Sequence, residues 1–104
     1  MNKIENYSLL NGTSFHGSVI KTTPNALIKL AESLGGDYNS DNGGDDKTNF
    51  DFGFETDNGI SFSVYDWKEY RSLDLSEVVT FHIGTHSKMD GITAKEELTN
   101  TLNK

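Results

Sequence analysis

The sequence predicts an α+β fold: a small antiparallel or mixed sheet of about four strands, in the element order β-α-β-β-β-α, with two helices on one face. Two amphipathic helical patterns, over 23–34 and about 90–102, and one alternating hairpin, over 50–65, lead to this prediction. Six Phe, four Tyr and one Trp supply aromatic bulk for a core, although only 34% of the residues are hydrophobic. A chain of 104 residues has room for one core, so we expect a single domain over 1–104.

The first part of the chain combines an unpatterned segment with a short strand. Residues 1–12 show no apolar period, so we expect a mobile arm or a short lead-in there. Alternation over 14–20 predicts a strand with Phe15 and Val19 on one side. Gly17, in the middle of this strand, indicates a β-bulge.

The helix predicted at 23–34 has both ends marked in the sequence. The Thr23 hydroxyl can accept a hydrogen bond from a free amide of the first turn, and Pro24 loses no helical hydrogen bond at the first position. Gly35 can adopt the left-handed conformation that ends a helix. Between these ends, apolar side chains at helical spacing form one stripe: Leu27, Leu30, Ala31 and Leu34.

Acidic residues are concentrated in a loop and in the strand that follows it. Residues 35–47 have the Gly, Asn and Asp composition of a loop. Residues 37–57 contain seven acidic side chains and one basic side chain, that of Lys47. Because the formal net charge is −7, we expect neither direct nucleic-acid binding nor a membrane partner.

Residues 50–65 predict a β-hairpin whose register follows from its two faces. Apolar residues alternate with polar residues or Gly on both sides of an Asp-Asn-Gly turn. A two-residue turn would place apolar side chains opposite polar ones, whereas a three-residue turn pairs Phe54 with Phe62. We therefore predict a three-residue turn with Gly59 in the left-handed conformation.

A further strand over 77–84 and a second helix over about 90–102 complete the predicted fold. The strand is expected to direct three side chains toward the core: Val79, Phe81 and Ile83. The helix has apolar residues at four-residue steps: Ala94, Leu98 and Leu102.

The side of the sheet away from the helices is predicted to carry polar and aromatic residues. Tyr65 and Trp67 share this side with Ser63, and His82 joins them if the last strand pairs alongside. Such a face is a candidate ligand site. Two alternatives remain open: the face packs under a loop or under 1–12, or it is buried against a second copy of the chain.

The segment 84–88 leaves a strand and leads into a helix. Its amides, its two hydroxyls and Lys88 are groups that bind an anion, although a strand-to-helix loop with a capping hydroxyl explains the same residues. If this segment meets the aromatic residues in space, the two parts form a site for an anionic ligand whose ring stacks on Tyr65 or Trp67. The predicted ligand-binding residues are Tyr65, Trp67, Lys68, Arg71, His82, Gly84, Thr85, His86 and Ser87.

The sequence gives little support for catalysis. It contains no Cys nucleophile, no Gly-x-Ser-x-Gly turn and no dinucleotide-binding fingerprint. An enzyme would have to use His82 or His86 with Asp66 or Glu69 as an acid-base partner. We leave the question of an enzyme open and favour a non-enzymatic protein with no catalytic residues and no cofactor.

Two patterns approach metal-binding motifs without matching them. His82 and His86 are four residues apart, but the intervening Gly argues against one helix that carries both. Asp37, Asn39 and Asp41 are spaced like the start of a calcium loop, but the glycine comes one residue late and the twelfth position is Thr. We predict no native metal site and leave weak calcium binding open.

The sequence also bears on location. No charged-then-apolar leader opens the chain, and no apolar run approaches the roughly 20 residues of a membrane span. The absence of Cys excludes disulfides and fits a reducing compartment. We expect a cytoplasmic protein.

Two short runs carry a family resemblance. They are 65–68, Tyr-Asp-Trp-Lys, and 81–84, Phe-His-Ile-Gly, and an Asp-Asn-Gly turn precedes both. With these runs the chain resembles, over roughly 15–98, a family of small phage-encoded proteins that have a Tyr-Asp-Trp-Lys run and a Trp-His-Ile-Gly-Gly run. Phe81 stands where the family has Trp, and Thr85 stands where it has the second Gly.

The resemblance implies a phage protein that acts against bacterial immunity in the host cytoplasm. The first route is sequestration of a small anionic, nucleotide-type immune signal in a pocket often built between subunits, which leaves a homo-oligomer open. The alternative is direct, acidic inhibition of a host defence protein, as a nucleic-acid mimic, through Asp37, Asp41, Asp45 and Asp46. A third route is an unrelated phage housekeeping role.

Overall fold

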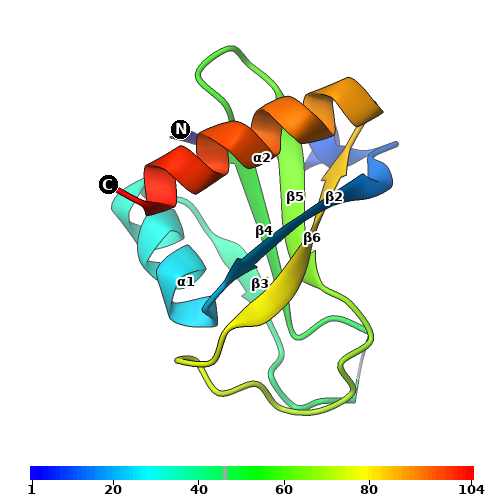
Figure 1. The fold of residues 1–104 in the computed structure, drawn as a ribbon, viewed down its shortest axis with the longest axis vertical. Helices are drawn as coiled ribbons and strands as arrows, with labels where there is room; N and C mark the ends of the chain where they lie inside the picture. Colours follow the sequence, from blue (N-terminus) through cyan, green and yellow to red (C-terminus); the bar gives the residue numbers. More distant parts are fainter. Residues whose placement is uncertain (46) are drawn as a thin grey trace.

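The computed structural model describes residues 1–45 and 47–104 and has an α+β architecture (Figure 1). None of the helices in these ranges combines the length and the apolarity that a bilayer crossing requires. The elements, in chain order, are β1 (Asn2–Lys3), the 3-10 helix η1 (Tyr7–Leu10), β2 (Ser14–Thr22), α1 (Pro24–Ser33), β3 (Tyr38–Ser40), β4 (Phe50–Glu55), β5 (Ser61–Asp66), β6 (Val79–Thr85) and α2 (Lys88–Leu102).

Six strands form one antiparallel sheet in the order β1-β4-β5-β6-β2, and β3 also pairs with β4. β1 and β3 lie along the same edge of β4, because β1 pairs with its last two residues and β3 pairs with its first three. The prediction of about four strands was therefore too low. The two extra strands are two and three residues long, too short for an alternating apolar pattern to reveal them.

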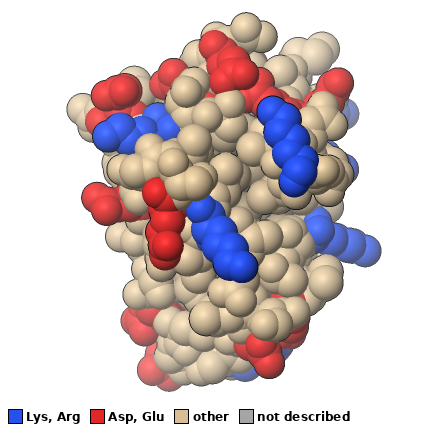
Figure 2. Space-filling view, turned by 90° about the vertical axis from the view of Figure 1, so that its left-hand side faces the viewer, with Lys and Arg blue, Asp and Glu red and all other residues tan. Residues whose placement is uncertain are grey.

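Charged side chains of both signs are interspersed on the face turned toward the viewer in Figure 2. No broad area of one sign covers this face.

The β4–β5 hairpin has the predicted register. Phe54 pairs with Phe62, and the three residues after Thr56 form the turn. Gly59 has a φ of 89°, in the left-handed region, and its amide donates to the Thr56 carbonyl at 2.9 Å. The Phe side chains of the two strands consequently share one face of the sheet.

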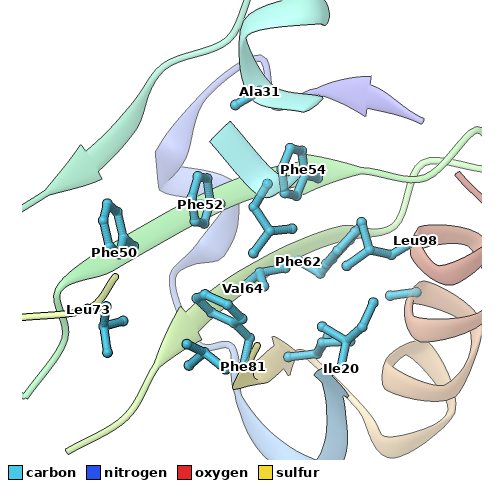
Figure 3. Packing of buried hydrophobic residues seen from close by; sticks show 14 residues of the cluster. Ile20, Ala31, Phe50, Phe52, Phe54, Phe62, Val64, Leu73, Phe81 and Leu98 are labelled. Carbon is cyan, nitrogen blue, oxygen red and sulfur yellow. The ribbon is translucent and has the colours of Figure 1, made fainter. Parts of the chain in front are cut away.

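Both helices cover that face, and the hydrophobic core lies between them and the sheet (Figure 3). Phe52 is fully buried, with its ring centroid 6.1 Å from that of Phe54 and 6.5 Å from that of Phe81. Burying one such ring contributes about 1.5–3 kcal/mol to stability. The helices supply four buried side chains to this cluster: Leu27, Ala31, Ala94 and Leu98.

Each of the two α-helices is preceded by a residue whose hydroxyl caps it. Thr23 Oγ1 accepts from the Ala26 amide at 3.1 Å, immediately before α1. Ser87 Oγ accepts from the Asp90 amide at 3.1 Å, so α2 begins at Lys88, slightly earlier than predicted.

Residues 1–12, for which the sequence suggested a mobile arm or a lead-in, pack against the sheet. β1 pairs with β4, and η1 contacts β5. Ile4 is buried, and the Tyr7 hydroxyl donates to the Asp37 carbonyl at 2.6 Å. We call residues 4–10 the N-terminal cover.

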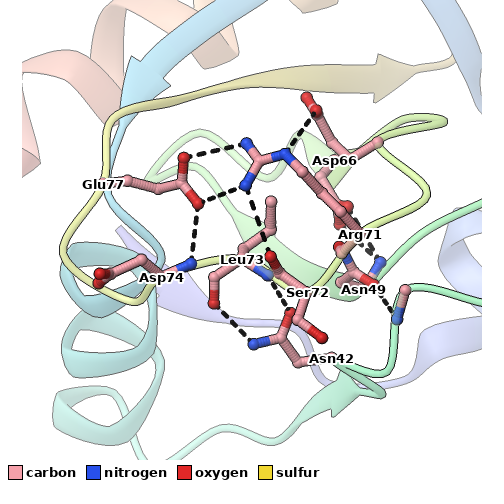
Figure 4. Close-up of polar contacts among 10 residues, drawn as sticks. Asn42, Asn49, Asp66, Arg71, Ser72, Leu73, Asp74 and Glu77 are labelled. Atoms are coloured by element: carbon pink, nitrogen blue, oxygen red, sulfur yellow. Dashed lines mark hydrogen bonds and ion pairs between the residues drawn. The ribbon is translucent and has the colours of Figure 1, made fainter.

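Side-chain amides join the loop before β4 to the loop after β5 (Figure 4). The Asn42 amide binds both backbone groups of Leu73: Nδ2 donates to the carbonyl at 2.8 Å, and the Leu73 amide donates to Oδ1 at 2.6 Å. Asn49 Nδ2 donates to the Arg71 carbonyl at 2.8 Å. These bonds hold the two loops together beside the end of the sheet that carries Trp67.

Candidate ligand-binding face

A row of paired residues crosses the sheet on the face opposite the helices. Asp51 of β4 pairs with Tyr65 of β5, and Tyr65 pairs with His82 of β6. Val19 of β2 pairs with His82, and Asn39 of β3 pairs with Asp51. Paired residues on neighbouring strands point to the same face, so these five side chains form one line from β3 to β2.

Four rings form a continuous aromatic surface along this row. Phe15 stacks on His82 with ring centroids 4.0 Å apart and planes 16° apart. Tyr65 meets His82 edge to face at 5.6 Å and Trp67 edge to face at 6.0 Å. We call Phe15, Tyr65, Trp67 and His82 the aromatic face. Its two ends are open to solvent, because Phe15 is 43% exposed and Trp67 is 41% exposed.

Two lysines lie beside the indole at one end of the aromatic face. Lys68 Nζ is 5.5 Å and Lys47 Nζ is 5.8 Å from the Trp67 ring centroid. The Lys68 amide donates to the Lys47 carbonyl at 2.6 Å, which ties the two backbones together. Lys68 also has a φ of 56°, a left-handed conformation that is uncommon for a residue other than Gly. The structure therefore concentrates two ammonium groups at an exposed ring in an otherwise acidic protein.

Asp51 joins the aromatic face to a polar cavity of about 320 Å³. The cavity is lined by Asn39, Ser40, Asp41, Thr48, Asn49 and Asp51. Among the described residues, no side-chain or backbone donor forms a hydrogen bond to the Asp51 carboxylate. Burial, and then the nearby Asp66 carboxylate, raise the pKa of Asp51 above its ordinary value.

The pKa values of the neighbouring rings also reflect burial. Burial, and then the Asp51 carboxylate, raise the pKa of Tyr65. Burial lowers the pKa of His82, so the imidazole is held in its neutral form. A neutral His82 stacks on Phe15 and keeps one nitrogen available as a hydrogen-bond acceptor.

The N-terminal cover occupies the other half of this sheet face. Gly53 is buried beneath it: a Cβ at Gly53 would lie 3.0 Å from the Tyr7 ring, 3.1 Å from Ile4 and 3.3 Å from Leu10. Ser63 is buried as well. The alternative in which the face packs under 1–12 therefore holds for Gly53 and Ser63, whereas the aromatic face stays partly open.

The predicted residues 84–87 comprise the end of β6 and the turn that leads into α2. Gly84 is buried, and a Cβ there would come within 2.5 Å of Ser63 Oγ and 3.5 Å of the Tyr65 ring. Thr85 is fully buried and its hydroxyl donates to the Ser87 carbonyl at 2.6 Å, while Ser87 caps α2. These contacts are those of a capping loop, the alternative explanation of the segment.

His86 and Arg71, both predicted ligand-binding residues, are engaged elsewhere. The His86 ring nitrogen Nε2 is 3.0 Å from the Leu9 carbonyl, at the end of the N-terminal cover. The Arg71 guanidinium forms two hydrogen bonds to Glu77, at 2.7 and 2.9 Å. The structure therefore brings together Tyr65, Trp67, Lys68 and His82, and holds these two residues in other contacts.

The acid-base partners considered for an enzyme do not face the histidines. Asp66 pairs with Phe81 on the core side and is fully buried. Its carboxylate accepts hydrogen bonds from the Asn49 and Phe50 amides, both at 2.8 Å. Glu69 lies 3.8 Å from the Arg71 guanidinium. Asp66 thus binds the backbone amides at the start of β4 and does not contact an imidazole.

Three residues of the site, Phe15, Lys47 and Asp51, were not among the predicted ligand-binding residues. Phe15 reaches His82 across a register shift between Phe15 and Val19, where Gly17 has a φ of 98°. The bulge predicted at Gly17 indicated that the strand is irregular there, but alternation alone does not define which residues pair on the far side of the bulge. Lys47 lies far from Trp67 in the sequence, and no local pattern connects them.

Within 1–45 and 47–104, no three His, Cys, Asp or Glu side chains are grouped so that they could hold a metal ion. Comparisons with family models, with curated proteins and with solved structures give no match. The resemblance to small phage proteins therefore stays an expectation, and the geometry of the site carries the functional argument.

Proposed function

We propose that this chain is a non-enzymatic binding protein that holds a small anionic, nucleotide-type ligand on its aromatic face. The observation that carries the proposal is the exposed Trp67 indole, with the ammonium groups of Lys47 and Lys68 within 6 Å of its centroid. An exposed ring flanked by two cations suits a ligand that combines a flat ring with a phosphate.

The neighbouring groups fit the two parts of such a ligand. A base that stacks on Trp67 gains about 1–3 kcal/mol, whichever base it is. A phosphate beside Lys47 and Lys68 meets the local positive charge that a chain of net charge −7 does not offer in general. The Asp51 carboxylate and the polar cavity next to it can accept hydrogen bonds from the amino groups of a base.

The resemblance supplies the proposed biological context. Under this proposal the protein is a phage counter-defence factor in the host cytoplasm that sequesters a nucleotide immune signal. Binding without turnover is sufficient for sequestration, and no acid-base pair joins His82 or His86 to a carboxylate in the described residues.

The test is thermal stabilisation of the full chain by a panel of mononucleotides, cyclic di- and trinucleotides and ADP-ribose derivatives. A ligand at a hundredfold excess over its Kd raises stability by about 2.7 kcal/mol. For the best ligand, Trp67→Ala is expected to weaken binding about 5- to 150-fold, the equivalent of one stacked base.

Tyr70→Ala provides the matched control, because Tyr70 is an exposed aromatic residue, 55% exposed, outside the aromatic face. The affinity of the Tyr70→Ala variant for the best ligand of the panel is expected to equal that of the wild type. A panel without any stabilising member, or equal losses in the two variants, would contradict the proposal.

A second candidate is direct, acidic inhibition of a host defence protein. It rests on the exposure of three carboxylates near β3: Asp37, Asp41 and Asp45. Asp46, the fourth predicted residue, lies outside the described residues. This candidate predicts salt-sensitive capture of a host protein that is lost when the three exposed acids become Asn. Capture that survives the triple substitution would exclude these side chains as its cause.

A further inference from the structure

β2 forms one end of the sheet and has a free backbone edge in the described structure. Its strand partner is β6, and α2 packs over its core side, where Gly91 approaches Ser18. The strand runs for nine residues, Ser14–Thr22. The opposite edge of the sheet differs, because β1 and β3 both line β4 there. One long edge therefore presents unpaired amides and carbonyls that can pair with another strand.

The charge distribution identifies a strand that such an edge can accept. The chain has sixteen acidic residues, yet 6–31 contain none, and β2 itself carries Lys21 and His16. Two copies of a protein with a net charge of −7 repel each other over most orientations. They approach at the lowest electrostatic cost through this acid-free segment.

Exposed apolar side chains lie on both sides of the same edge. On one side, Phe15 is 43% exposed. On the other side, α2 carries Met89 and Ile92, which are 70% and 50% exposed, in the turn that contacts β2. Aromatic residues and Met are enriched in the cores of protein interfaces.

We propose that β2 pairs antiparallel with β2 of a second copy, about a two-fold axis perpendicular to the sheet. The resulting dimer has a continuous sheet with the four α-helices on one side and both aromatic faces on the other. The contact is self-complementary and uses the single long free edge of each copy, so assembly closes at two chains. The Gly17 bulge interrupts the regular edge and limits pairing in other registers.

When the two β2 strands pair along their length, Phe15 of each copy lies near Lys21 of the other, and both aromatic faces lie on the same side of the joint sheet. One further consequence rests on the proposed function: each dimer carries two ligand sites, one on each aromatic face. Dimer formation itself does not depend on that function.

The experiment is the molar mass of the full chain in solution, measured by light scattering after gel filtration and by sedimentation, over a range of protein and salt concentrations. We expect twice the chain mass of 11.5 kDa, and a stronger dimer at higher salt because screening reduces the repulsion of like charges. Phe15→Glu and Lys21→Glu, which place acids along the edge, are expected to give monomers, whereas Tyr70→Glu stays dimeric.

Far-UV circular dichroism establishes that each variant is folded, and concentration-dependent protection of the β2 amides in hydrogen exchange locates the contact in the wild type. A wild-type mass of one chain at every concentration would overturn the proposal, as would a dimer that survives both edge substitutions. Failure of the nucleotide panel leaves these readouts unchanged, so the two proposals can fail separately.

Discussion

Gly44 lies where the loop before β4 meets the loop after β5, and it leaves no room for a side chain. Its φ is 83°, and a Cβ there would lie 2.8 Å from the Arg71 backbone and 2.9 Å from the Ser72 amide. Gly44→Ala combines backbone strain with a clash that no rotamer relieves, so we expect a loss of about 2–4 kcal/mol in the free energy of unfolding. Urea denaturation of the wild type and the variant measures this loss.

Gly59→Ala separates the two contributions. Gly59 has a similar φ of 89°, but a Cβ there would meet nothing within 4 Å. Its substitution should therefore cost only the conformational part, about 1–2 kcal/mol. Equal losses at Gly44 and Gly59 would show that the loops separate to admit the methyl group.

Asp51 is expected to reduce stability at neutral pH. Because its pKa is raised above 3.8 in the folded protein, the folded state binds the proton more tightly than the unfolded chain. The contribution of protonated Asp51 to the free energy of unfolding is thus fully present below pH 3.8 and is lost as the pH rises through the pKa of Asp51 in the folded protein. Asp51→Asn should raise the Tm at pH 7 and weaken nucleotide binding, as expected of a residue retained for a ligand.

Asp45→Asn serves as the comparison, because Asp45 is an exposed carboxylate in the loop that precedes β4. Its Tm at pH 7 should equal that of the wild type. A lower Tm for Asp51→Asn than for Asp45→Asn would mean that the charged form of Asp51 stabilises the fold.

At the scale of elements, the two loops beside Trp67 depend on one amide. Asn42→Ala removes both hydrogen bonds to the Leu73 backbone, so we expect a loss of about 1–3 kcal/mol and faster hydrogen exchange in the loop after β5. Asn42→Asp keeps the acceptor for the Leu73 amide but sets a carboxylate oxygen against the Leu73 carbonyl with no hydrogen between them, so its loss should be at least as large. Ser72→Ala, at an exposed position of the same loop, should change neither quantity. Equal exchange in all three variants would contradict this role of Asn42.

The elements that the sequence predicts are those with a period of their own. The β4–β5 register follows from alternating Phe residues, because a slip of one position would turn every side chain over. β1 and β3 follow instead from pairing with a formed β4, which two or three residues cannot encode locally. The same distinction applies to the site: alternation places Tyr65 beside Trp67, whereas Lys47 reaches Trp67 through the fold of a loop.

At the scale of the whole molecule, the sheet has one face for the core and a second face that is divided. The helices, together with Leu73 of the loop after β5, bury the apolar side chains of the first face. The N-terminal cover buries Gly53 and Ser63 on the second face, and the aromatic face occupies the remainder. A small protein thereby stabilises a two-sided sheet without a third layer and still keeps a concentrated group of rings partly exposed.

The N-terminal cover is therefore expected to stabilise the fold without taking part in ligand binding. Ile4 is 8% exposed and packs near Gly53, so Ile4→Ala should cost about 2–3 kcal/mol. Leu9→Ala, at a 44% exposed position of the same segment, should cost less than about 0.5 kcal/mol. Urea denaturation and hydrogen exchange over residues 4–10 measure both, and nucleotide affinity below the unfolding transition should be unchanged. An Ile4→Ala variant as stable as the wild type would show that residues 4–10 contribute little to the fold, and the division of the second face would then rest on the aromatic residues alone.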